Sequence, residues 1–329
     1  MKRFDMTVSL NECAQYLKEN DNFLILSHEH PDGDTLGSAF ALIAILRAAG
    51  KKCAFKCADR IPKDFSYITA DYRDDDIKPE CIVAVDVADK KLLGSLCAEY
   101  GDRVNMCIDH HLSNTGYAER VCLRECAATS ELIFELCALL GTAPDKYIGE
   151  CVYTGISTDT GCFRYQNTTA ETLNLAAKMY DLGIDSAKIN KLMFETKSKS
   201  MLALETLARE TLEYYFDGRC AVISVTQAMY RQSGSNEGEC YVITSLPRQI
   251  EGVAVGAVIK EKPDGTYDIS VRTDSGIDAS SICRRLGGGG HKGAAGCTLE
   301  LPYNETKRRL LEEIGCALEQ SYDGNISCK

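Results

Sequence analysis

Tryptophan is absent from the 329-residue sequence, and proline and histidine are scarce, with seven and five residues. The sequence also lacks an apolar run near the roughly 20 residues that span a bilayer, and residues 1–10 lack the apolar core of a secretory signal. We therefore expect a soluble cytoplasmic protein without membrane contact. Its length and its 45% hydrophobic content are typical of globular chains and predict two domains of roughly 150 residues.

Positive charge is also scarce, because 37 lysines and arginines face 48 aspartates and glutamates and leave a net charge of −11. Binding to duplex DNA or to an anionic membrane requires a basic face. The sequence disfavours both partners, and it disfavours an exonuclease acting on long DNA for the same reason. An anionic substrate would need cations held locally.

Cysteine is abundant, with 17 residues, but no two cysteines stand in C-x-x-C spacing. They are scattered through apolar segments, which favours buried free thiols in a reducing compartment over disulfides. The closest pairs, Cys53/Cys57 and Cys122/Cys126, have no neighbouring histidine. A structural zinc site is therefore disfavoured.

The first half alternates short apolar runs with helical stretches. Residues 22–27 predict a buried strand, and residues 35–49 predict an apolar helix that ends at Gly50. Further strands are predicted over residues 52–57, 81–86 and 104–109. Because these runs do not alternate polar and apolar residues, both faces of the sheet should be covered, as in parallel α/β proteins.

The second half begins with a polar helical pattern over residues 168–215. Strands are then predicted over 219–226, 253–260 and 266–273, the last two joined by a turn at 263–265. We therefore expect an α/β fold in which a helical connector joins a parallel-sheet N-terminal domain to a smaller α+β C-terminal domain with a mixed sheet. The expected boundaries are 1–190, 191–215 and 216–329.

All five histidines lie in polar or glycine-rich segments, at positions 28, 30, 110, 111 and 291. The first four accompany aspartates at the ends of predicted strands. These aspartates are Asp32 and Asp34 after the first strand, Asp86 at the end of the third and Asp109 at the end of the fourth, and Asp159 follows a helical run. Since ligands bind beyond the carboxyl ends of parallel strands, we expect these side chains to converge.

Such a concentration of carboxylates would be repulsive without cations. Carboxylate and imidazole ligands without thiolate favour Mn²⁺, with magnesium, cobalt and iron as alternatives. The number of ligands exceeds the needs of one ion and predicts a pair about 3.5–4 Å apart. Each motif alone is also compatible with a turn, a helix cap or a strand end, but together they favour a metal centre.

A glycine-rich segment spans residues 287–296. It formally contains G-x-G-x-x-G, but residues 294–301 predict a strand where a dinucleotide site needs a helix. We expect the amides of Gly288, Gly289 and Gly290, with His291, to bind a phosphate, and Arg272 to clamp it. The alternatives are a flexible loop and a solvated strand residue.

The order of these motifs resembles the DHH phosphoesterase superfamily over nearly the whole chain. The resemblance rests on H-x-x-P-D-x-D at 28–34, Asp86, the tripeptide Asp109-His110-His111, Asp159, and a second half similar to the DHH-associated C-terminal domain. A two-domain chain of this size is similar to the nanoRNase/pAp phosphatase branch. His30 departs from the pattern, because asparagine is more usual there.

The resemblance implies which residues hold metal. One ion would be bound by His28 and Asp32, the other by Asp34, His110 and Asp159, with Asp86 bridging them. It also implies a homodimer as a further partner. We expect Asp109 to orient a ligand histidine, and His111 to contact phosphate or protonate the leaving group.

The activity implied by the resemblance is hydrolysis of short oligoribonucleotides to 5′-mononucleotides and of adenosine 3′,5′-bisphosphate to AMP. Two ions would ready a water molecule for attack on phosphorus. A phosphodiesterase acting on cyclic di-AMP or pApA would use the same residues. A non-catalytic nucleotide sensor is the alternative from another class.

Overall fold

The computed structural model describes residues 7–274 and 276–323. The chain divides between Thr196 and Lys197 into two compact units. The predicted connector region contains a π-helical turn, Lys191–Glu195, and a helix, α9 (Lys199–Arg209), that belongs to the C-terminal unit.

The N-terminal unit is built on a five-stranded sheet of order β2-β1-β3-β4-β5, and every pairing in it is parallel. The strands are β1 (Phe23–Leu26), β2 (Cys53–Lys56), β3 (Cys81–Val85), β4 (Met106–Asp109) and β5 (Arg120–Leu123). The predicted parallel α/β fold is confirmed. All residues of β1, β3 and β4 are buried, as expected for strands covered on both faces.

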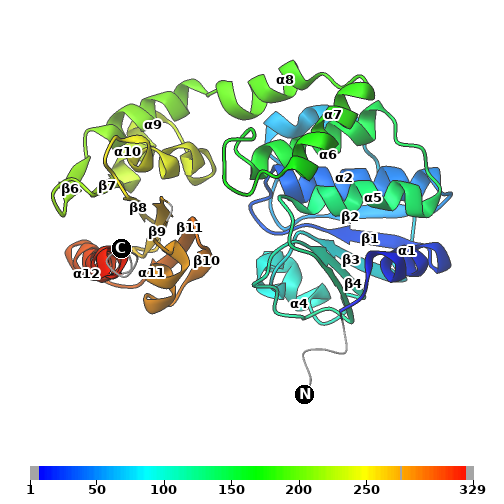
Figure 1. Cartoon of the computed structure of the whole chain (residues 1–329), viewed down its shortest axis with the longest axis horizontal. Coiled ribbons are helices and arrows are strands. Elements are labelled where there is room, and N and C mark those ends of the chain that lie inside the picture. The colour runs from blue at the N-terminus through cyan, green and yellow to red at the C-terminus, as the bar shows by residue number, and fades with distance from the viewer. Residues whose placement is uncertain (1–6, 275, 324–329) are drawn as a thin grey trace. The chain divides into compact units, whose positions relative to one another are not determined.

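Helices cover both faces of this sheet (Figure 1). Alternate residues of each strand join different clusters: Phe23 and Ile25 pack with α2, α5 and α6, whereas Leu24 and Leu26 pack with the segment around Leu93 and Tyr100. The helices are α1 (Leu10–Glu19), α2 (Gly33–Ala48), α3 (Ser66–Thr69), α4 (Cys97–Tyr100), α5 (Thr129–Leu140), α6 (Lys146–Asp159), α7 (Ala170–Asp181) and α8 (Ser186–Asn190).

The C-terminal unit contains a six-stranded mixed sheet of order β10-β11-β9-β8-β7-β6. The strands are β6 (Glu213–Tyr215), β7 (Cys220–Val225), β8 (Val255–Glu261), β9 (Tyr267–Thr273), β10 (Gly289–His291) and β11 (Ala294–Leu299). Only the β7–β8 pairing is parallel among these described strands. The predicted β8–β9 hairpin is confirmed, and the Lys262 amide closes its turn by donating to the Thr266 carbonyl at 2.8 Å.

Two layers of helix pack on this second sheet. The helices α11 (Ala279–Arg285) and α12 (Tyr303–Asp323) cover one face, while α9 and α10 (Gln227–Ser233) contribute to the apolar cluster on the other. The predicted helical stretch was wrong over Glu213–Tyr215. These residues form an edge strand instead, because they pair with β7 from Glu213–Val222 to Tyr215–Cys220.

The cysteines that the structure describes are free thiols, as the sequence predicts. Sixteen of the cysteines lie in the described part of the chain, and all of these are free thiols, eleven of them buried. No helix in that part combines the length and the apolar character needed to cross a membrane.

Candidate metal centre

The carboxyl edge of the first sheet collects the acidic and imidazole side chains. His28 follows β1, Asp86 follows β3, and Asp109 is the last residue of β4. Asp32 caps the N-terminus of α2, accepting hydrogen bonds from the amides of residues 34 and 35 at 3.1 Å each. Asp159 was expected after a helical run but is the last residue of α6 itself.

The first group of facing ligand atoms comprises His28, Asp32 and Asp86. His28 Nε2 lies 3.6 Å from Asp32 Oδ1 and 3.8 Å from Asp86 Oδ2. The three ligand atoms lie within 4.8 Å of one another. Ligand atoms about 2.0–2.2 Å from a shared ion lie at such separations from each other.

The second group comprises Asp34, His110 and Asp159, whose ligand atoms also lie within 4.8 Å of one another. His110 Nε2 lies 3.4 Å from Asp159 Oδ2 and 3.6 Å from Asp86 Oδ1. Asp86 therefore presents one carboxylate oxygen to a histidine of each group. The structure thus brings together all six side chains that the sequence analysis placed around a pair of ions.

Asp86 is held in an unusual backbone conformation. Its φ of 59° is in the left-handed region, which is uncommon for residues other than glycine. Its amide donates to the Ile108 carbonyl of the neighbouring strand at 2.9 Å. Such a conformation persists only where surrounding contacts impose it, and here it accompanies a carboxylate shared by both groups.

The electrostatics of the cluster call for cations. Burial, followed by the charges of Asp34 and Asp32, raises the pKa of Asp86 and of Asp159 well above the usual range. Burial alone would lower the pKa of His28, but Asp32 and Asp86 outweigh it and raise that pKa to about 10. Without cations, these carboxylates repel one another and hold protons. A donor set of carboxylates and imidazoles suits hard divalent ions, which would relieve that repulsion.

Backbone carbonyls orient two of the histidines. Nδ1 of His28 lies 2.6 Å from the carbonyl oxygen of Glu29, and Nδ1 of His110 lies 3.0 Å from that of Cys126. Because a carbonyl only accepts, each Nδ1 carries the proton and each Nε2 faces the carboxylates. This is the usual arrangement for histidines that bind metal.

Asp109 is fully buried and organises the tripeptide rather than joining either group of ligands. It accepts from the His110 amide at 2.9 Å, from His111 Nδ1 at 2.7 Å and from Asn114 Nδ2 at 2.6 Å. It therefore orients the ring of His111 and only the backbone of His110. Burial opposes both ionised forms, but this contact outweighs it, lowering the pKa of Asp109 and raising that of His111.

Thr129 and Ser130, at the start of α5, support the centre but were missed by the sequence analysis. Their amides donate to the two carboxylate oxygens of Asp34, at 2.6 and 3.0 Å. The Thr129 hydroxyl donates to Asp86 Oδ1 at 2.9 Å. A Cβ at Gly155 of α6 would lie 2.5 Å from Asp34 Oδ1, so the glycine permits this close approach.

His30 lies apart from both groups of ligands. Its side chain is 87% exposed, and its Nδ1 contacts Asp59 Oδ2 at 2.7 Å. Its amide donates to the same oxygen at 2.8 Å, which fixes the residue at a left-handed φ of 52°. The structure therefore gives this histidine an acidic partner outside the metal centre.

The predicted phosphate-binding residues of the C-terminal unit lie on β9 and β10, except Gly288, which directly precedes β10. Arg272 is on β9, and its Nη1 donates to the Val271 carbonyl at 3.0 Å. A Cβ at Gly288 would lie 2.1 Å from the Gly296 carbonyl oxygen, and a Cβ at Gly290 would lie 2.6 Å from Ala295 Cα. Packing against β11 therefore requires glycine at both positions.

Gly289 has open space around the position of a Cβ. The segment, for which a flexible loop was the alternative to a phosphate site, thus contains a short strand. His291 ends β10, and its predicted side-chain role lies outside what the structure describes.

Known proteins resemble both units. Residues 22–156 match the DHH family, N-terminal domain, and residues 218–320 match the DHHA1 domain. The bifunctional oligoribonuclease and PAP phosphatase NrnA of Thermus thermophilus is 33% identical, over 88% of this chain and 88% of its own length.

Two further proteins resemble the chain over most of its length. A probable bifunctional oligoribonuclease and PAP phosphatase NrnA of Streptococcus mutans is 25% identical, over 91% of this chain and 96% of its own. An exopolyphosphatase-related protein from Bacteroides fragilis has the same fold, with a TM-score of 0.82 at 24% identity over 94% of this chain and 96% of its own.

Proposed function

Because the chain belongs to the DHH family, we propose that it is a two-metal phosphoesterase that hydrolyses short oligoribonucleotides and removes the 3′ phosphate of adenosine 3′,5′-bisphosphate. One observation carries this proposal: two groups of ligand atoms share the carboxylate of Asp86. The names of the relatives support the substrates, and the donor chemistry supports the reaction.

His28, Asp32 and Asp86 would hold one ion, and Asp34, His110 and Asp159 would hold the second with Asp86. Two divalent ions, most favourably Mn²⁺, supply an activated water and neutralise charge on the phosphoryl oxygens. This accounts for the binding of a polyanion by a chain whose net charge is −11.

His111 is the residue we assign to the substrate. Its Nδ1 contacts Asp109 Oδ1 at 2.7 Å and its side chain is 22% exposed. We assign this ring to a phosphate oxygen or to the leaving 3′ oxygen. Asp109 keeps that ring oriented and favours its protonated form. A protonated imidazole both binds phosphate and donates a proton to a leaving group.

The C-terminal unit would bind a phosphate of the substrate away from the cleaved bond. Arg272 offers a bidentate fork, and the amides of Gly288, Gly289 and Gly290 would approach the phosphate. His291 completes this proposed set.

A product panel tests the proposal. With Mn²⁺ added, the purified chain should release AMP from adenosine 3′,5′-bisphosphate and 5′-mononucleotides from dinucleotides, with little action on long RNA. Turnover of cyclic di-AMP or pApA in place of these would reassign the substrate within the same chemistry. Tight nucleotide binding without any turnover would replace the enzyme by a sensor.

A further inference from the structure

The segment that follows α6 has an unusual backbone conformation. Gly161, Cys162 and Phe163 are consecutive residues with φ of 56°, 59° and 62°, all in the left-handed region. Glycine adopts this region readily, but Cys162 and Phe163 adopt it only at a cost in conformational energy. These residues come shortly after Asp159, the candidate metal ligand that ends α6. Surrounding contacts must therefore hold this strained turn in place beside the metal centre.

Contacts with the end of α6 impose the turn. The Thr160 carbonyl accepts from the Arg164 amide at 2.9 Å, and the Thr160 hydroxyl accepts from the Phe163 amide at 3.0 Å. The Phe163 ring packs against the Tyr153 ring of α6, with the ring centroids 5.9 Å apart. The chain therefore folds back along the end of α6 and brings Asn167 next to it.

Asn167 joins two segments that are distant in the sequence. Its Nδ2 donates to the carbonyl oxygen of Asp159 at 3.1 Å and to that of Ala127 at 3.2 Å. A side-chain amide nitrogen carries two hydrogens, so both contacts form at once. Because Asn167 is exposed, its replacement removes these contacts without opening a cavity in the core.

The segment around Ala127 holds the other two ligands of the second group. The carbonyl oxygen of the preceding residue, Cys126, lies 3.0 Å from His110 Nδ1. Two residues after Ala127, the Thr129 amide donates to Asp34 at 2.6 Å. The side-chain amide of Asn167 thus connects the backbone segments that position all three ligands of this group.

We propose that Asn167 is a positioning residue that sets the affinity of the metal ion held by the second group. Among residues 7–274 and 276–323, it forms no hydrogen bond with His28 or Asp32 of the first group. The first ion should therefore depend little on it. This inference rests on the proposed function, because it requires that the two groups of ligands bind metal.

Calorimetric titration of the metal-free chain with Mn²⁺ tests this assignment in two background variants. Asp32→Asn removes a ligand of the first group alone, and Asp159→Asn removes a ligand of the second group alone. Adding Asn167→Ala to Asp32→Asn should weaken binding of the remaining ion by about 10–100-fold. Adding it to Asp159→Asn should leave the affinity of the remaining ion unchanged, because the first group holds that ion.

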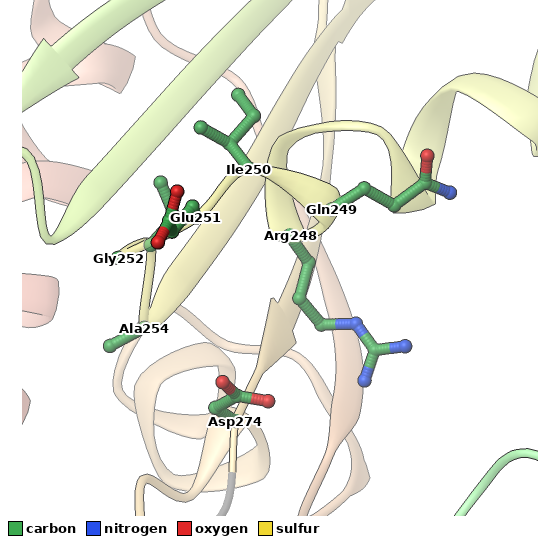
Figure 2. A pocket seen from close by; sticks show the side chains of 8 residues that line it. Arg248, Gln249, Ile250, Glu251, Gly252, Ala254 and Asp274 are labelled. Carbon is green, nitrogen blue, oxygen red and sulfur yellow. The ribbon is translucent and has the colours of Figure 1, made fainter.

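Further variants separate the donor groups of Asn167 from its bulk. Asn167→Asp keeps the shape but presents an oxygen to the two carbonyls, so it should weaken the second ion at least as much as alanine does. Asn167→Gln keeps the amide on a longer side chain and should restore part of the affinity. Two controls should bind Mn²⁺ as the wild type does: Gln166→Ala, at the exposed neighbour, and Gln249→Ala, at a residue that lines a cavity of the C-terminal unit (Figure 2).

Circular dichroism verifies that each variant is folded. An Asn167→Ala chain that binds both ions as tightly as the wild type would overturn the inference. An equal loss of affinity in both backgrounds would also overturn it, because it would indicate a general structural role. Failure of the proposed function has a different signature, which is a wild-type chain that binds two Mn²⁺ ions and hydrolyses none of the nucleotide substrates.

Discussion

At the scale of single residues, the metal centre consists of the ligands and of the residues that hold the ligands in position. The acids and imidazoles of the centre could be predicted, because carboxylate and imidazole are themselves the signal. The role of Thr129 could not be predicted, because it acts through a backbone amide and a hydroxyl, which many helix N-termini offer. Its contacts join Asp34 of one ligand group to Asp86, which faces both groups.

Thr129→Val should therefore weaken Mn²⁺ binding by about 10–100-fold, the usual cost of losing a contact to a metal ligand. The substitution removes the hydroxyl at Asp86 but keeps the amide at Asp34. Thr129→Ser restores the hydroxyl and should restore most of the affinity in calorimetric titration with Mn²⁺. Equal affinity in the valine and wild-type chains would show that the hydroxyl does not position Asp86.

At the scale of elements, the contact of α6 with α2 brings together Asp159 and Asp34, two ligands of the second group. Gly155→Ala would place a Cβ 2.3 Å from Ser130 Oγ and 2.5 Å from Asp34 Oδ1. We expect a loss of about 1–3 kcal/mol in the free energy of unfolding, as for other overpacked sites, together with weaker Mn²⁺ binding.

Gly149→Ala is the matched control on the same helix. Its Cβ would lie nearest to Ile184 Cγ2 and Leu182 Cδ1, at 3.0 and 3.1 Å, and these side-chain ends are able to shift. Urea unfolding and Mn²⁺ titration of both variants test the account. Unchanged metal affinity in Gly155→Ala would mean that helix packing does not set the position of Asp34.

The helix α9 carries a carboxylate whose charge stabilises the C-terminal unit. Glu205 is 5% exposed and contacts Lys197 Nζ at 2.5 Å and Arg209 Nη2 at 2.7 Å. Burial would raise its pKa, but the two cations outweigh burial and lower it. The stabilisation is therefore present above the unfolded pKa of about 4.3 and is lost as the pH falls through the lower folded pKa.

Glu205→Gln should lower the free energy of unfolding by about 1–2 kcal/mol at pH 7, since a hydrogen-bonded charge is lost. The difference from the wild type should shrink as the pH is lowered below about 4 and through the lowered folded pKa of Glu205, below which both chains lack this charge. Urea unfolding at a series of pH values measures it, with Glu210→Gln, on the exposed residue just beyond α9, as control. A difference that stays constant with pH would contradict the assignment.

At the scale of the whole molecule, the sequence predicted the strands and helices whose apolar pattern is strong. It missed β5, β6 and β10, which are four, three and three residues long. Such short strands are defined by their neighbours, because β5 is specified by pairing with β4 and β6 by pairing with β7. The convergence of distant acids was predictable for a general reason, since parallel strands end at one edge.

The number and coupling of bound Mn²⁺ ions test the central claim most directly. Electron paramagnetic resonance with calorimetry should show two ions per chain with a spin-coupled signal, and activity that EDTA abolishes and Mn²⁺ restores. Asp86→Asn, which alters the carboxylate facing both groups, should lose the coupled signal and turnover while the chain stays folded. Phosphoester hydrolysis by a wild-type chain that binds no divalent ion, or full activity of the asparagine variant, would contradict the account.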